Sequence, residues 1–359
     1  MNQEASNAAR LEPFCKLADP ARYLACVSDF STHPESRDHW VTFFRKHFET
    51  ILKLGIDAAR ARGEGPESAE ARADSARREF HRIIDAYMAH PDAHGRVTLL
   101  TLDAWRDDTL RAHGFYDAFI DLKNRDNEKA LPFLPSLCRE LDSLSGIEQF
   151  TAVIQGVFAG NIFDMGAPAT AHAVMGGSHD FHESRLAIRP RPWLFDDFDA
   201  LARRMLHGAP HHKAVFFIDN AGSDFLLGAL PMIRWLAQRG TQVVLAANEL
   251  PTLNDMTVAD VQAWWPRILQ TEPSLSKLPI HHVSTGSGNP LLDLNKVSPQ
   301  LNAASADADL VILEGMGRGV ESNLEAEFCC EALNLAMIKD EMVARQRGGK
   351  VFDVVCRFR

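Results

Sequence analysis

Two side chains with the chemistry of metal ligands stand together in the second half of the chain. Asp219 and Asn220 directly follow the apolar run at residues 214–218, a pattern typical of the end of a buried strand. Carboxylate and amide oxygens are the ligands that hard cations such as Mg²⁺ or Mn²⁺ prefer. Asp255, in the loop after the next apolar run at residues 242–246, could supply a third oxygen. The sequence therefore predicts a divalent-metal site made by Asp219, Asn220 and Asp255.

Later apolar runs end in groups that suit a phosphate ester. Arg318 lies in a glycine-rich stretch after residues 310–313, and Lys339 directly follows residues 333–338. An Arg or Lys at such a position is a natural partner of phosphoryl oxygens. Backbone amides around Gly286 could bind the same anion, because small residues let the backbone approach it. Together these groups fit one metal ion and one phosphate.

Two further polar residues stand at the ends of the same runs. Asn248 follows residues 242–246 and could orient the substrate or a metal-bound water. Glu314 follows residues 310–313 and could transfer the proton during hydrolysis. In the resulting hypothesis the metal site lowers the pKa of a coordinated water, and the basic residues neutralise charge on the phosphoryl group.

Other chemistries remain open for the same residues. Asp219 could attack phosphorus itself, but a haloacid-dehalogenase-like site would place a second Asp two residues later, where this chain has Ala221. A carboxyl methyltransferase should carry a glycine-rich loop for its methyl donor, and residues 219–224 hold one glycine and two acids. A non-catalytic protein that binds a metal or metabolite for regulation is a further alternative, although it would not need a full metal set.

The elements that must position these residues alternate between strand and helix after residue 191. Short apolar runs predict strands at residues 214–218, 242–246, 280–284, 310–313, 333–338 and 351–357, with helices at about 224–239 and 258–269. Such alternation predicts an α/β fold with a mostly parallel sheet flanked by helices. Ligands of these sheets bind outside the carboxyl ends of the strands, where the polar residues stand.

The first half of the chain has a helical pattern. Apolar residues recur at every third or fourth position, as in residues 40–48 and 76–87. Residues 166–192 are rich in Gly, Ala, His and Pro and form the predicted connection between the halves. We therefore expect an all-helical N-terminal region over residues 1–185 and an α/β region over residues 186–359 that carries the metal and phosphate site.

Composition limits the partners of the protein. The 359 residues are 46% hydrophobic and carry a formal net charge of −10, so we expect one or two globular domains and no nucleic-acid partner. No apolar run is long enough for a membrane span, and the polar start lacks a signal peptide. Six scattered cysteines without a CxxC pair predict reduced thiols and a cytoplasmic protein. The expected partner is a small phosphate ester, and the sequence leaves the oligomeric state open.

Seven motifs in this order resemble those of the damage-control phosphatase family, first described as domain of unknown function 89. They occupy residues 160–164, 218–224, 248–257, 285–288, 314–318, 337–339 and 348–352. The resemblance implies a phosphatase with a helical start, an α/β C-terminal region and a divalent metal ion (Mg²⁺, Mn²⁺, Co²⁺ or Ni²⁺). It also implies that Asp219, Asn220 and Asp255 bind this metal and that Lys339 contacts phosphate.

The same resemblance narrows the substrate. Asn161 and Asp164 match a motif that belongs near the site, and Asp164 is an alternative to Glu314 for handling the proton. Residues 314–323 are especially like the plant-type branch, which is similar to the phosphatase domain fused to the fourth animal pantothenate kinase. This branch implies 4′-phosphopantetheine or its S-oxidised forms as substrate, and other branches imply sugar phosphates such as fructose 1-phosphate. Met165 departs from the family pattern beside its motif, whereas the metal ligands are intact.

Overall fold

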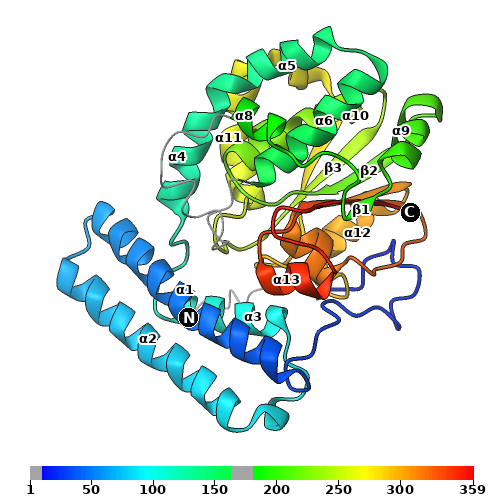
Figure 1. Ribbon diagram of the computed structural model, residues 1–359. Coiled ribbons are helices and arrows are strands. Elements are labelled where there is room, and N and C mark those ends of the chain that lie inside the picture. Colours follow the sequence, from blue (N-terminus) through cyan, green and yellow to red (C-terminus); the bar gives the residue numbers. More distant parts are fainter. Residues whose placement is uncertain (1–9, 163–180) are drawn as a thin grey trace.

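A central sheet organises the protein in the computed structural model, which describes residues 10–162 and 181–359 (Figure 1). The seven strands are β1 (Phe195–Asp196), β2 (Lys213–Phe217), β3 (Gln242–Ala247), β4 (Ile280–Ser284), β5 (Leu310–Glu314), β6 (Glu331–Met337) and β7 (Val354–Phe358). Their order across the sheet is β1-β7-β6-β5-β2-β3-β4, and every neighbouring pair is parallel except β6 and β7. The predicted α/β fold with a mostly parallel sheet is confirmed.

The apolar runs form strands because both faces of the sheet are buried. Along β2, Ala214 and Phe216 pack into one hydrophobic core, whereas Val215 and Phe217 pack into a second core on the other face. The last strand begins later than the predicted residue 351, because the backbone turns first and Lys350 N–H donates to the Asp353 carboxylate. The two-residue strand β1 was not predicted, since so short a run has no detectable period.

Helices cover the sheet on both sides. The helices are α1 (Pro34–Ala61), α2 (Pro66–Ala89), α3 (Leu99–Ala112), α4 (Ile120–Ala130), α5 (Leu134–Ser143), α6 (Gly146–Asn161), α8 (Phe181–Leu186), α9 (Phe198–His207), α10 (Leu230–Gln238), α11 (Val258–Thr271), α12 (Pro299–Ser305) and α13 (Glu341–Gln346). Helices α5, α6, α9, α10 and α11 share one core with a face of the sheet. The helical first half therefore extends into the packing of the α/β half through α5 and α6.

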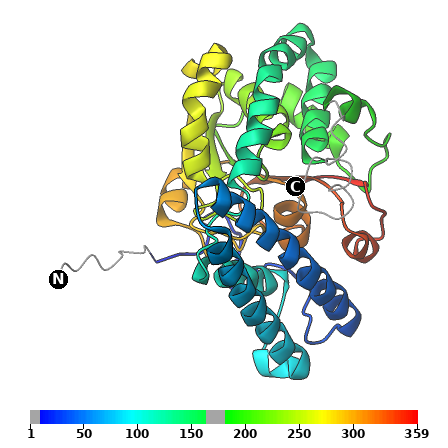
Figure 2. The same cartoon turned by 90° about the vertical axis from the view of Figure 1, so that its left-hand side faces the viewer.

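Helices α1 and α2 form a long hairpin that projects from the rest of the molecule in both views (Figures 1 and 2). The hairpin is closed by stacked aromatic rings, with the centroids of Phe48 and Phe80 4.2 Å apart. Its core also includes Leu291, Val320 and Ile338 from the α/β half. The predicted helical N-terminal region is thus present, and the α1–α3 unit packs against loops that follow the strands.

The chain before α1 differs from the helical pattern. Residues 10–33 contain no helix and run along the α/β half, where Glu12 pairs with Val297 and Leu17 pairs with Phe328. Phe14 is fully buried there and packs edge-on against Phe217.

All six cysteines are free thiols that form no disulfide bond. In the parts of the chain that the structure describes, no helix has both the length and the apolar character needed to cross a bilayer.

Candidate active site

The strand order creates a crevice at the carboxyl ends of β2 and β5. From β2 the chain moves outward through β3 to β4, and it then returns to place β5 on the other side of β2. The order of the strands therefore reverses between β2 and β5, and the carboxyl ends of the strands at such a point are the usual ligand position in sheets of this kind. Asp219 and Asn220 follow β2 at this point, and Glu314 is the last residue of β5.

Backbone pairing brings Asp255 to the same crevice. Asn220 and Asp255 form an isolated antiparallel bridge, and Met256 N–H donates to the Asp219 carbonyl over 3.0 Å. The Asn248 amide nitrogen donates to Asp255 Oδ2 over 3.0 Å, which fixes one oxygen of that carboxylate. The three predicted metal ligands therefore lie together, and Asn248 contacts one of them.

Arg318 joins the two carboxylates of this group. Its guanidinium donates to Asp219 Oδ1 through Nη1 and to Asp255 Oδ2 through Nη2, the latter over 2.7 Å. All three side chains are at least nine-tenths buried. Gly315 makes the approach possible, because it has a φ of +93° and a Cβ atom there would lie 2.0 Å from Asp219 Oδ2. The positive charge of Arg318 thus already balances the two carboxylates that the sequence assigns to the metal.

A second group of acids lies behind Asp219. Ligand oxygens of Asp219, Asp224 and Glu314 all lie within 4.8 Å of one another. The Asn161 amide, at the end of α6, donates to Asp219 Oδ2 over 3.3 Å, to Asp224 Oδ2 over 3.1 Å and to Glu314 Oε1 over 3.1 Å. Asp219 therefore presents Oδ1 to Arg318 and Oδ2 to this buried group.

Burial raises the pKa of each carboxyl group in this second group. Burial raises the pKa of Glu314 well above its ordinary value, and the nearby charges of Asp224 and Asp219 raise it further. Burial also raises the pKa of Asp219, although Arg318 opposes the shift. The pKa of Asp224 is raised by burial and lowered in part by Lys339. Glu314 Oε2 also accepts a hydrogen bond from Asp219 N–H over 2.9 Å, which ties the buried group to the backbone of the predicted metal ligand.

One pocket opens onto the first group of ligands. It has a volume of about 690 Å³, counting the space open to solvent, and lies between α1, α3 and the loops after the strands. Its polar lining includes Asp219, Asn220, Asp255, Asp103, Arg106, Glu321 and Asp340, and its apolar lining includes Trp40, Phe43, Phe44, Leu99, Leu253, Pro290, Leu291 and Met316. The metal ligands therefore share a pocket with an aromatic surface from α1.

The other predicted site residues differ in their distance from this pocket. Asn161 and Glu314 lie in the buried group behind Asp219. Lys339 is 1% exposed just beyond β6, and its charge acts on Asp219 and Asp224. The remaining two are Gly286, which packs close to Leu11 and Ser298 and does not line the pocket, and Asp164, which lies outside the described residues.

The donor set fits a hard divalent cation. Asp219, Asn220 and Asp255 offer carboxylate and amide oxygens on one wall of an open pocket, which leaves room for water and substrate. Two buried oxygens nearby, Asn161 Oδ1 and Asp224 Oδ1, accept no hydrogen bond from the described residues. Unsatisfied oxygens beside a set of hard ligands are consistent with a cation site, because a cation satisfies lone pairs that no donor reaches.

Sequence reasoning missed several residues of the site. Asp224 follows a strand end and reads as an ordinary helix cap, but it begins a π-helical turn, Asp224–Ala229, and joins the buried acids. The α1 aromatic residues and the α3 pair of Asp103 and Arg106 also line the pocket. Their helical spacing resembles that of any core-facing helix, so the sequence carries no signal for them.

Asp103 gives a prediction for stability against pH. Burial raises its pKa to about 7, although Arg106 opposes the shift with an ion pair of 2.6 Å. The folded state therefore keeps a proton that the unfolded state has lost, and this contribution to stability disappears as the pH rises from about 4 to about 7. Between pH 5 and pH 8, we expect the Tm of Asp103→Asn to fall about 5 °C less than that of wild type. Equal slopes, or the same change in the exposed control Asp108→Asn, would contradict this assignment.

Comparison with known proteins identifies the family. The sequence model of the damage-control phosphatase ARMT1-like domain matches residues 44–355. Pantothenate kinase 2 of Arabidopsis thaliana is 38% identical over 97% of this chain and 42% of its own length. A damage-control phosphatase of the same plant is 37% identical over 81% of this chain and 80% of its own. A mouse protein named 4′-phosphopantetheine phosphatase is 30% identical over 95% of this chain and 48% of its own.

The fold has a counterpart among solved structures. A DUF89 family protein from Pyrococcus horikoshii superposes with a TM-score of 0.63 at 18% identity, covering 88% of this chain and 96% of the other. The chain spans less than half the length of the pantothenate kinases that it matches. The family resemblance of the motifs is nevertheless confirmed over most of the sequence. This chain belongs to the ARMT1-like damage-control phosphatase family.

Proposed function

We propose that this protein is a divalent-metal-dependent phosphomonoester hydrolase that acts on 4′-phosphopantetheine or its S-oxidised forms. One observation carries the proposal: Asp219, Asn220 and Asp255 line the same pocket as an aromatic surface of α1. The first group suits a metal and a phosphoryl group, and the second suits an alcohol with apolar parts. The name of the mouse relative supports this substrate class.

The proposed mechanism assigns metal binding to Asp219, Asn220 and Asp255. A divalent cation bound there supplies Lewis-acid chemistry, which withdraws charge from a phosphoryl oxygen and makes a neighbouring water more acidic. Arg318 keeps the two carboxylates at a fixed separation and offsets their repulsion. The ligands are thus ordered before the substrate arrives, so little reorganisation is needed during the reaction.

The remaining charged groups take different roles. We assign Lys339 to the negative charge that gathers on the phosphoryl group, since it is a buried cation beside the acids at the strand ends. Glu314 contacts the Asp219 backbone N–H, and both Glu314 and Asp224 contact Asn161, which also binds Asp219, so we assign them the task of holding that ligand. They act through the ligand and do not contact the substrate.

The lining of the pocket favours pantetheine over a sugar as the leaving alcohol. The pantoyl part of 4′-phosphopantetheine carries two methyl groups on the carbon next to the phosphorylated one, and these can cover Phe43 and Met316. A sugar phosphate has a hydroxyl on most of its carbons, and each one buried against an aromatic ring without a partner costs free energy. We therefore rank 4′-phosphopantetheine above fructose 1-phosphate.

Phosphate release by metal-stripped protein tests the function. Mg²⁺, Mn²⁺, Co²⁺ and Ni²⁺ would be added back in turn with 4′-phosphopantetheine, fructose 1-phosphate or p-nitrophenyl phosphate. We expect metal-dependent release with the highest kcat/KM for 4′-phosphopantetheine. Phosphate release from fructose 1-phosphate alone would show that the substrate is a sugar phosphate and not 4′-phosphopantetheine. Folded protein that releases no phosphate with any metal would favour a non-catalytic metabolite-binding role.

Phe43 offers a separate test of the leaving-group surface. It is half-buried on α1, where its ring packs edge-on against Trp40. Phe43→Ala removes apolar contact from the pocket, and we expect the KM for 4′-phosphopantetheine to rise about tenfold, equivalent to about 1.4 kcal/mol. The KM for fructose 1-phosphate should change less than about twofold. The exposed Phe133→Ala is the control, and equal changes for both substrates would refute a selective surface.

A further inference from the structure

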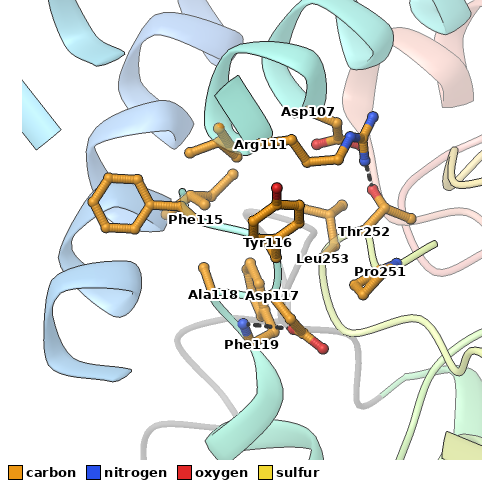
Figure 3. A pocket seen from close by; sticks show the side chains of 12 residues that line it. Asp107, Arg111, Phe115, Tyr116, Asp117, Ala118, Phe119, Pro251, Thr252 and Leu253 are labelled. Atoms are coloured by element: carbon orange, nitrogen blue, oxygen red, sulfur yellow. Dashed lines mark hydrogen bonds between the residues drawn. The ribbon is translucent and has the colours of Figure 1, made fainter. Parts of the chain in front are cut away.

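A buried ion network connects α3 to the loop that carries Asp255. Arg106 is 1% exposed and donates to Asp107 Oδ1 over 2.7 Å and to the Thr252 hydroxyl over 3.0 Å. Its third nitrogen pairs with Asp103 over 2.6 Å. The Thr252 hydroxyl in turn donates to Asp107 Oδ2 over 2.7 Å. Figure 3 shows the contact between Asp107 and Thr252 where α3 meets the loop.

Thr252 is also bonded directly to Asp255. The Asp255 N–H donates to the Thr252 carbonyl over 3.1 Å, so the residue that α3 holds by its side chain holds Asp255 by its backbone. Between them, Leu253 has a φ of +44°, a left-handed conformation that a branched side chain rarely adopts. Such a conformation persists only when its surroundings fix it.

The network is costly to break. Arg106 is almost completely buried, so losing one of its acceptors would leave buried charge with an incomplete set of partners. Within residues 10–162 and 181–359, the guanidinium of Arg106 pairs with the two carboxylates of Asp103 and Asp107 and donates to one uncharged side chain, that of Thr252, which is 4% exposed. These contacts therefore hold the loop firmly against α3, although the two segments are far apart in sequence.

We propose that Thr252 is a positioning residue through which α3 sets the place of Asp255 as a metal ligand. The inference rests on the proposed metal role of Asp255. The helical unit then does more than cover the pocket, because it orders one ligand of the metal before the cation binds. Residues that orient a ligand in this way typically change metal affinity tenfold or more when they are replaced.

Direct Mn²⁺ binding, measured by calorimetry on metal-stripped full-length protein, tests this role. Thr252→Val keeps the shape of the side chain and removes its hydroxyl, and we expect the Kd for Mn²⁺ to rise about tenfold. Thr252→Ser keeps the hydroxyl and should bind Mn²⁺ within about twofold of wild type. Saturating Mn²⁺ should restore most of the lost phosphatase rate, since only the position of a ligand has changed.

Thr109→Val is the matched control. Thr109 is a buried threonine of α3, and its hydroxyl donates to the Trp105 carbonyl over 2.7 Å. Through this hydrogen bond it therefore makes no contact with the loop. An equal loss of Mn²⁺ affinity in this control, or wild-type affinity in Thr252→Val, would overturn the positioning role and leave the proposed function intact. If wild-type protein binds none of Mg²⁺, Mn²⁺, Co²⁺ and Ni²⁺, both proposals fall. Thr252→Ala decides the same question should the valine variant not fold.

Discussion

Asp255→Ala is expected to lower kcat/KM by at least about 10³-fold, or about 4 kcal/mol of transition-state stabilisation. The variant removes one of the two carboxylates that we assign to the metal, and it also leaves Arg318 with a single carboxylate partner. The Kd for Mn²⁺ should rise at least about a hundredfold, because an anionic ligand is lost from a small set. Activity assays and calorimetry on the same preparation measure both effects.

Metal removal provides the companion result. Chelation should abolish phosphate release from wild-type protein, and a divalent ion should restore it. Asp108→Ala, a change in an exposed carboxylate on α3, should alter neither value. Phosphate release that survives complete chelation, or an active Asp255→Ala enzyme, would exclude the proposed metal chemistry. Trapping of phosphate on Asp219 would instead indicate the covalent route.

Lys339→Met should lower kcat/KM by about 10²–10³-fold while the Kd for Mn²⁺ stays within about threefold. Methionine keeps most of the volume of the buried side chain. It removes the positive charge that, in our proposal, offsets the negative charge of the phosphoryl group. The loss should appear mainly in kcat, because charge on the phosphoryl oxygens grows toward the transition state.

Two controls distinguish a loss of catalysis in Lys339→Met from a loss of folding. The exposed Lys350→Met is the control for loss of a lysine charge. Thermal unfolding should show that Lys339→Met is folded at the assay temperature. Unchanged kcat/KM would rule out a role in catalysis. Parallel loss of Mn²⁺ binding would reassign Lys339 to the acids around Asp224, whose pKa its charge lowers.

The sheet and the site residues at its carboxyl edge are predictable from residue order. Runs such as residues 214–218 are apolar without interruption, and in a parallel sheet their carboxyl ends must lie at a common edge. Polar residues that follow these runs, among them Asp219 and Lys339, are therefore site candidates on the basis of the sequence alone. The order of several motifs also indicated the family, which the comparisons confirm.

The roles of the individual site residues depend on tertiary contacts that residue order does not reveal. Arg318 reads as a phosphate partner in the sequence, yet it bridges Asp219 and Asp255 because the glycine-rich turn after β5 folds back toward β2. Asp224 reads as a helix cap, yet a π-helical turn directs it into the buried acids. Local patterns specify elements, but the direction of a side chain in a loop depends on what packs around it.

The residues of α1 and α3 that line the pocket are equally unpredictable from the sequence. Phe43 and Arg106 have the spacing of ordinary core residues, and Arg106 meets Thr252 across 146 positions of the chain. Contacts between such distant segments follow from the docking of α1–α3 onto the sheet, and no local pattern encodes that docking. The polar residues that follow the strands can thus be predicted from residue order. The surface that we expect to select the substrate forms only when the chain folds.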